Sequence, residues 1–221
     1  MVQLERDLLV KNDGLARKNR DFLRERRIAM LNLIGSPGAG KTALLEATIR
    51  TLRDELDLAV LEGDQATELD AARIARAGAP VVQITTGAGC HLDAQMVADS
   101  IAALDPQRGS LLFVENVGNL VCPALFDLGE RAKVVVMSVT EGEDKPLKYP
   151  HVFRAASLLV LTKLDLVRHL DFDVERCIDY ARTSNPRLEV ICLSAQQGAG
   201  LDVWCDWVRK QQPDGARAVT L

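Results

Sequence analysis

The sequence lacks a long hydrophobic run, and it has little excess charge of either sign. No apolar stretch approaches the ~20 residues that a transmembrane helix needs. The first residues, MVQLERDLLVKNDG, are too charged for a secretory signal peptide. The formal net charge of -4 provides no broad basic surface for nucleic acid or anionic lipid. We therefore expect a cytoplasmic protein that binds neither nucleic acid nor a membrane.

Cysteine and histidine are also scarce, with five and three copies. An odd number of cysteines cannot all pair, and in a reducing compartment they are free thiols. Cys177, Cys192 and Cys205 stand in apolar helix or strand patterns, so we expect them to be small core residues. His151 and His169 stand alone and are expected on the surface.

Short apolar runs alternate with helical segments along most of the chain. This alternation predicts an α/β fold, with a mostly parallel central sheet and helices on both faces. The length of 221 residues suits one sizeable core. We expect an N-terminal helical extension at 1–27, broken near Asn12 to Gly14, then one domain at 28–211 and a flexible tail at 212–221. The apolar runs are residues 28–34, 58–63, 80–86, 111–116, 134–140, 158–163 and 190–195.

A phosphate-binding pattern follows the first apolar run. GSPGAGKT at 35–42 matches G-x-x-x-x-G-K-[ST] and opens a helix, which is the context of a P-loop NTPase. Its backbone N–H groups and the helix N-terminus can hold phosphate oxygens, Lys41 can reach the β- and γ-phosphates, and Thr42 can ligate Mg²⁺. The alternative is a glycine-rich turn before a helix. The predicted contacts are Gly35, Ser36, Gly38, Ala39, Gly40, Lys41 and Thr42.

Two acidic residues at strand ends can complete a magnesium site. Asp64 lies in LEGDQAT and Glu115 in LLFVENVGNL. The second string resembles the D-x-x-G switch of GTPases, with Glu115 in place of aspartate and Gly118 as the glycine that senses the γ-phosphate. We expect Lys41, Asp64 and Glu115 to be the catalytic residues. The alternative for each acid is a helix cap or a surface carboxylate.

LTKLDL at 161–166 resembles the guanine motif N-K-x-D, with Thr162 in place of asparagine. Asp165 can accept from N1–H and the exocyclic amine of guanine, whereas adenine leaves it unpaired. The Lys163 stem can pack along the base. Ser194 and Ala195 lie where a second guanine-contacting loop belongs, and the Ala195 N–H can meet O6. The pattern predicts GTP rather than ATP.

TTGAGCHLDAQMV places Cys90 beside His91, and Cys122 follows Glu115 by seven positions. Thiolate and imidazole suit Zn²⁺ and Ni²⁺. Both segments follow strands, so a parallel sheet can bring them to one edge. One chain then offers three ligands at most, and two subunits can share the site across a two-fold axis. The alternative is buried cysteines with no ligand role. We expect Asp93 to cap the next helix.

The strings GSPGAGKT, EGDQAT, TTGAGCHLDAQMV, ENVGNLVCP, TEGEDKPLKYP and TKLDL, in this order, resemble the HypB family of SIMIBI-class GTPases, which help to insert nickel into hydrogenase. The resemblance covers residues 12–208. The related urease GTPases carry a Cys-Pro-His arrangement, which is absent here. The resemblance implies GTP-favoured homodimers with metal at the interface, a partner nickel chaperone and the hydrogenase large subunit as client. Many members carry an N-terminal cysteine-rich motif or a histidine-rich tract, but no cysteine or histidine precedes Cys90 here. We therefore expect this chain to bind metal at the site formed by Cys90, His91 and Cys122.

These observations predict a GTP-hydrolysing metallochaperone. GTP and Mg²⁺ would hold the segment from Glu115 to Gly118, position Cys122 near Cys90 and His91, and favour the dimer. No glutamine stands in an obvious place to orient the attacking water, so we expect slow hydrolysis without a partner. Two alternatives remain, a P-loop kinase of small molecules and a regulatory GTPase with a structural zinc site. Lys145 and Lys148 could cross a subunit interface, although we expect both to be solvated.

Overall fold

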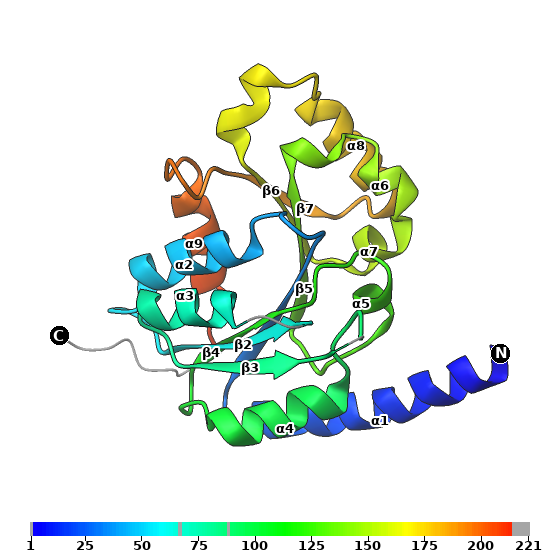
Figure 1. The fold of residues 1–221 in the computed structure, drawn as a ribbon, viewed down its shortest axis with the longest axis vertical. Helices are drawn as coiled ribbons and strands as arrows, with labels where there is room; N and C mark the ends of the chain where they lie inside the picture. Colours follow the sequence, from blue (N-terminus) through cyan, green and yellow to red (C-terminus); the bar gives the residue numbers. More distant parts are fainter. Residues whose placement is uncertain (1, 66–67, 88, 214–221) are drawn as a thin grey trace.

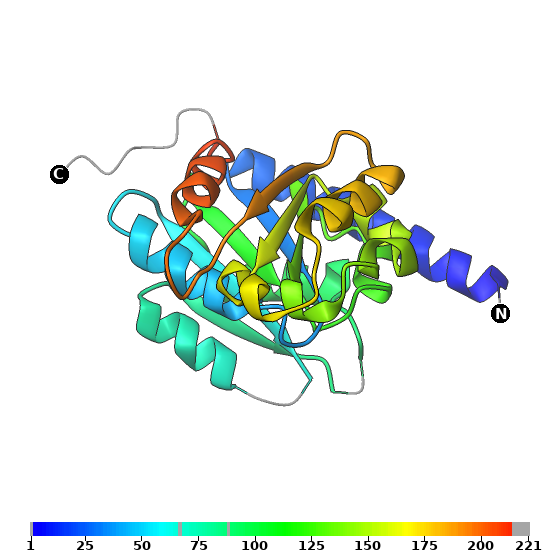
Figure 2. The ribbon, with the colours of Figure 1, turned by 90° about the horizontal axis from the view of Figure 1, so that it is seen from above.

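The computed structural model describes residues 2–65, 68–87 and 89–213. Within these ranges, seven strands form one parallel sheet in the order β3-β2-β4-β1-β5-β6-β7 (Figures 1 and 2). Each strand coincides with one of the predicted apolar runs, so the predicted α/β fold is confirmed. The strands are β1 Ala29–Ile34, β2 Leu58–Asp64, β3 Val81–Thr85, β4 Leu111–Glu115, β5 Ala132–Ser138, β6 Leu158–Thr162 and β7 Glu189–Cys192.

Several strand ends differ from the ends of the predicted apolar runs, and the structure shows the cause at the end of β5. The fifth apolar run was expected to continue to residue 140, but β5 ends at Ser138 and a 3-10 turn, η1, covers Val139–Glu141. The Ser138 side chain accepts from the Thr140 N–H, and the Glu141 carboxylate accepts from the Ser138 N–H. This capping box ends the strand although the next two residues, Val139 and Thr140, are β-branched and favour strands.

Helices cover both faces of the sheet (Figures 1 and 2). One face carries α2, α3 and α9, whose apolar residues share a core cluster with β1, β2 and β4. The opposite face carries α1 and α4 over one half, and α5, α7 and α8 over the other. The helices are α1 Val2–Glu25, α2 Lys41–Leu52, α3 Leu69–Ala77, α4 Ala94–Leu104, α5 Cys122–Leu125, α6 Lys145–Lys148, α7 Pro150–Ala155, α8 Val174–Ser184 and α9 Leu201–Arg209, with a second 3-10 helix, η2, at Leu164–His169.

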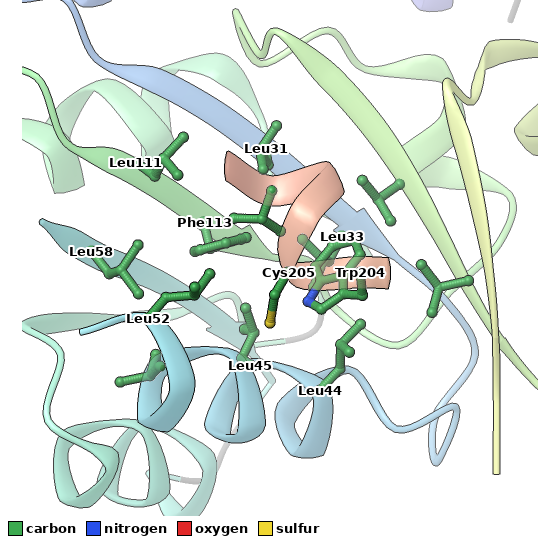
Figure 3. Packing of buried hydrophobic residues seen from close by; sticks show 14 of the residues in the cluster. Leu31, Leu33, Leu44, Leu45, Leu52, Leu58, Leu111, Phe113, Trp204 and Cys205 are labelled. Carbon is green, nitrogen blue, oxygen red and sulfur yellow. The ribbon is translucent and has the colours of Figure 1, made fainter. Parts of the chain in front are cut away.

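The largest core cluster lies between the sheet and α2 and α9 (Figure 3). Trp204 of α9 is fully buried beside Leu44 and Leu45 of α2. Its indole N–H donates to Thr48 Oγ1 at 2.7 Å, so the one polar atom of this large side chain is satisfied inside the core. The packing holds α2, and therefore the loop before it, against the central strands.

The cysteines and histidines expected to have structural or surface roles lie as predicted. Cys177 and Cys205 are buried in the core, and Cys192 is half-buried against it. Burial raises the pKa of the Cys177 thiol to about 12, so this thiol stays protonated. His151 and His169 are exposed.

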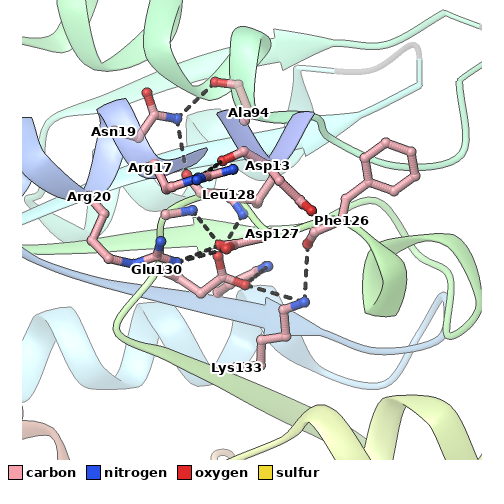
Figure 4. Close-up of polar contacts among 12 residues, drawn as sticks. Asp13, Arg17, Asn19, Arg20, Ala94, Phe126, Asp127, Leu128, Glu130 and Lys133 are labelled. Carbon is pink, nitrogen blue, oxygen red and sulfur yellow. Dashed lines mark hydrogen bonds and ion pairs between the residues drawn. The ribbon is translucent and has the colours of Figure 1, made fainter. Parts of the chain in front are cut away.

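The N-terminal helix α1 is continuous, so the predicted break near Asn12 is wrong. The Asn12 side chain is buried and makes tertiary contacts instead of a turn: Oδ1 accepts from the Ala94 N–H at 2.9 Å, and Nδ2 donates to Asp127 O at 2.8 Å. Further along the same helix, Asn19 Nδ2 donates to Ala94 O and Leu128 O (Figure 4). These contacts bind α1 to the start of α4 and to the loop before β5. The sequence pattern could not anticipate this role because asparagine also favours turns.

No helix in the described part of the chain is long and apolar enough to cross a membrane. Residues 214–221 of the predicted tail lie outside the described residues.

Candidate nucleotide and metal site

The phosphate loop joins β1 to α2 at the carboxyl edge of the sheet. Gly38 and Gly40 have φ of 75° and 96°, a region that favours glycine. A β-carbon on Gly35 would overlap Val136 O, so glycine is required there for a different reason, the close approach of β5. Lys41 Nζ donates to Gly35 O at 3.4 Å and is therefore folded back over the loop. This geometry fits a loop whose N–H groups wrap a phosphate.

The two predicted guanine segments lie side by side, and the first of them, at 161–166, also contacts the phosphate loop. Thr162 Oγ1 donates to Ala39 O at 2.6 Å, and Lys163 Nζ donates to Gly38 O at 2.7 Å. The hydroxyl of Thr162 therefore links the 161–166 segment to the phosphate loop. Leu164 N donates to Leu193 O at 3.2 Å, which places Asp165 in η2 near the loop that begins with Ser194 and Ala195.

A group of carboxylates lies beside Thr42. Its hydroxyl donates to Glu115 Oε1 at 2.8 Å. Glu62, Asp70 and Glu115 each bring a carboxylate oxygen within 4.8 Å of the others. Glu62 and Asp70 were not predicted. Glu62 is paired in register with Glu115 across β2 and β4, a neighbourhood that only the strand order reveals. The predicted Asp64 lines the same cavity but is not a member of this group.

Burial changes the proton affinity of this group. It raises the pKa of Glu115 to about 7, although the nearby Lys41 and the bond from Thr42 oppose the rise. Burial raises the pKa of Glu62 to about 8, with further increases from the charges of Glu115 and Asp64. Glu115 Oε2 is buried without a hydrogen-bond partner among the described residues. Hard oxygen donors in this state fit a divalent cation such as Mg²⁺, which would displace the protons.

These groups line one cavity of about 430 Å³. Its wall includes Lys41, Thr42, Glu115 and Gly118, and it also includes Cys90 of the predicted metal site. A β-carbon on Gly118 would lie 2.8 Å from Pro37 Cγ, so the switch-like loop touches the phosphate loop directly. Gln65 also lines the cavity, and its Nε2 donates to Gly89 O at 3.3 Å. Sequence reasoning missed this glutamine because its place on the cavity wall depends on the fold.

The predicted metal ligands come together. Cys90 Sγ lies 3.1 Å from Cys122 Sγ and 3.6 Å from His91 Nδ1, and the three ligand atoms lie within 4.8 Å of one another. The two adjacent residues can therefore turn both side chains toward one point. The His91 ring lies against Phe126, with centroids 3.9 Å apart. Thiolate and imidazole at these distances can hold Zn²⁺ or Ni²⁺.

The surroundings of His91 and Cys122 shift their pKa values in opposite directions, which matters because a metal binds the deprotonated forms. Burial lowers the pKa of His91, opposed by the charge of Asp93, and this favours the neutral ring, which can donate a lone pair to a metal. The hydrogen bond with Cys90 raises the pKa of the Cys122 thiol, so this thiol holds its proton more tightly than an exposed cysteine does. Asp93 Oδ1 accepts from the Met96 N–H at 2.8 Å, which confirms it as the cap of α4.

The expectation that both lysines of the 145–148 segment are solvated is correct for Lys148 and wrong for Lys145. Lys148 is exposed and pairs with Asp144 at 2.6 Å. Lys145 is half-buried, 3.4 Å from Ser36 Oγ of the phosphate loop and 3.5 Å from Glu141 Oε2. The short helix α6 points its first side chain at the phosphate loop, and the sequence pattern did not predict this contact.

Comparison with known proteins gives a consistent result. The profile of the "CobW/HypB/UreG, nucleotide-binding domain" family matches residues 29–192. Hydrogenase maturation factor HypB of Azotobacter vinelandii is 56% identical over 218 residues, which cover 99% of this chain and 72% of that protein. The HypB of Escherichia coli K12 is 55% identical, over 96% of this chain and 73% of that protein.

Solved structures agree. HypB from Archaeoglobus fulgidus superposes with a TM-score of 0.85 at 40% identity, over 91% of this chain and 98% of that one. HypB from Helicobacter pylori in complex with nickel superposes with a TM-score of 0.86 at 32% identity, over 96% and 99% of the two chains. With its parallel sheet, its phosphate loop and its Cys/His group, this chain belongs to the HypB family of hydrogenase maturation factors, which are P-loop nucleotide-binding proteins.

Proposed function

We propose that this chain is a GTP-hydrolysing metallochaperone that carries nickel at Cys90, His91 and Cys122, and that the bound nucleotide controls the hold on the metal. The observation that carries the proposal is the shared cavity: Cys90 lies on the same wall as Lys41 and Thr42. Cys122 lies on the segment that starts at Glu115, which contacts Thr42. Loss of the γ-phosphate would therefore affect Cys90 through the shared cavity and Cys122 through the short segment that begins at Glu115.

Separate groups of this chain would hold the phosphates, the base and the magnesium ion of the nucleotide. Lys41 and the phosphate-loop N–H groups would bind the phosphates, while Asp165 and Ala195 would select guanine. Thr42 and Glu115 would hold Mg²⁺, with Asp64, Glu62 or Asp70 completing the oxygen ligands. When bound, this ion neutralises the developing charge on the phosphates. Gly118, against Pro37, would sense the γ-phosphate through its N–H. Hydrolysis would release this loop.

We propose that GTP favours a homodimer that completes the metal site. Three ligands from one chain are one fewer than a closed tetrahedral site needs. The residues next to Cys122 also suggest a covered surface, because Val121 and Leu125 are 52% and 54% exposed although both are large and apolar. A second copy related by a two-fold axis would cover them and add ligands. Zinc could occupy the same donors.

The relatives' name, hydrogenase maturation factor, supports a role in hydrogenase assembly. We propose that nickel passes from this chain to the hydrogenase large subunit, with a partner nickel chaperone in the same process. Since the ligands must lose protons to bind metal, nickel uptake should weaken as the pH falls. Nickel is the cargo of this cycle, and it is released when hydrolysis of GTP loosens the segment from Glu115 to Cys122.

The deciding experiment titrates the purified protein with Ni²⁺ and with Zn²⁺, in GDP and in a non-hydrolysable GTP analogue, while light scattering reports mass. We expect the analogue to favour the dimer and to change nickel affinity. Cys90→Ala should abolish that difference, whereas Cys192→Ala, which removes another half-buried thiol away from the site, should leave it intact. Equal nickel affinity in both nucleotide states, or an unchanged Cys90→Ala protein, would refute the proposal.

A further inference from the structure

Two asparagines of the segment between β4 and α5 hold the loop that carries Cys90 and His91. Asn116 follows Glu115 directly and is buried. Its Oδ1 accepts from the Leu92 N–H at 3.2 Å and from the Val117 N–H at 3.1 Å. One side-chain oxygen therefore joins the residue after His91 to the backbone of the switch-like loop.

Asn119 makes the second connection, directly after Gly118. Its Nδ2 donates to Cys90 O at 3.2 Å, and its Oδ1 accepts from the Val121 N–H at 2.8 Å. The amide thus spans from the backbone of one metal ligand to the residue preceding another, Cys122. An asparagine amide has both a donor and an acceptor, so a substitution that keeps only one of them loses one of these two hydrogen bonds.

The segment from Glu115 to Cys122 consequently touches the nucleotide site at one end and the metal loop through Asn116, Asn119 and Cys122. The side chain of Asn116 is also held by the strand β1, because its Nδ2 donates to Asn32 Oδ1 at 3.2 Å. Asn32 Nδ2 in turn donates to Glu130 Oε1 at 3.3 Å. Asn116 is therefore held on several sides, whereas Asn119, beside Gly118, is half-buried. The segment is therefore part of one hydrogen-bond network between the two sites, and such networks can couple distant sites.

We propose that Asn116 and Asn119 are the positioning residues through which the nucleotide state changes nickel affinity, with Asn119 as the moving link. This inference rests on the function proposed above and assigns the residues that carry its coupling. Neither side chain ligates the metal in this assignment. Linkage requires that GTP change nickel affinity by the same factor by which nickel changes GTP affinity, so the coupling is a measurable ratio.

The test measures Ni²⁺ affinity of the full chain by competition with a chromogenic chelator, with GDP and with a non-hydrolysable GTP analogue, for the wild type, Asn119→Ala and Asn119→Asp. We expect both variants to bind each nucleotide and nickel, while the ratio of the two nickel affinities moves toward one by about 2- to 10-fold, the range that one hydrogen bond supplies. A purely structural role for Asn119 would change both affinities equally and leave the ratio unmoved.

The matched control is Asn185→Ala. Asn185 is also half-buried and also donates through Nδ2 to backbone oxygens, those of Phe153 and Ala156, away from both sites. Its variant should keep the wild-type ratio. A wild-type ratio in both Asn119 variants overturns the inference while the proposed function stands. A ratio of one in the wild type itself refutes the proposed nucleotide control, and this inference with it.

Discussion

The carboxyl of Glu62 should make the nucleotide-free protein lose stability as pH rises. Burial raises its pKa from 4.5 to about 8. Because the folded protein then holds the proton more tightly than the unfolded chain does, the free energy of unfolding falls as pH rises between about 4.5 and about 8. The effect is complete once pH exceeds the folded pKa.

The expected size follows from these two pKa values. Between pH 6 and pH 9, such a group lowers the free energy of unfolding by about 3 kcal/mol, at about 1.36 kcal/mol for each factor of ten in proton affinity. Water in the adjoining cavity screens part of this, so we expect a loss of about 1–3 kcal/mol. For a chain of this length, that is about 2–12 °C in melting temperature.

The assay is thermal and urea unfolding of the metal-free, nucleotide-free protein from pH 6 to pH 9, for the wild type and Glu62→Gln. Glutamine keeps the shape of the side chain and cannot ionise. The variant should therefore gain stability relative to the wild type as pH rises. Glu189→Gln, at an exposed position of the edge strand β7, is the control and should follow the wild type. If the Glu62→Gln and wild-type curves run parallel within about 0.5 kcal/mol, the reasoning is refuted.

Three further predictions concern the nucleotide site. Gly118→Ala should reduce the ratio of the affinities for a GTP analogue and for GDP, because the new β-carbon would lie 2.9 Å from Pro37 N. Competition with a fluorescent nucleotide measures both affinities, and an unchanged ratio contradicts the role of Gly118 as γ-phosphate sensor. Asp165→Asn should weaken GTP binding by about 10- to 100-fold, since a lost charged hydrogen bond costs about 1.5–3 kcal/mol, and a variant with wild-type GTP affinity would remove Asp165 from the guanine site. Thr162→Val should lower the melting temperature by about 2–4 °C because the bond to Ala39 O is lost, and calorimetry showing no decrease would mean that this bond adds nothing to stability.

The sequence alone predicted the features that depend on contiguous residues. The phosphate loop and the proposed guanine motif depend on glycine freedom, backbone N–H groups and a few adjacent side chains, so a short string contains most of their chemistry. Alternation of apolar runs and helices was sufficient for the parallel sheet. The parallel sheet in turn predicted that Cys90 and Cys122 lie close together, because the carboxyl ends of parallel strands share one edge of the sheet.

Two parts of the structure depend on strand order and on packing between distant segments. Glu62 became a neighbour of Glu115 only because β2 lies beside β4, which neither residue's local pattern indicates. Asn12 looked like a turn residue, yet in the fold it pins α1 to the start of α4. The sequence does not indicate whether such a polar side chain will form a local hydrogen bond or one to a distant segment. The tertiary structure decides, because a polar side chain that is buried must form its hydrogen bonds with the groups packed around it.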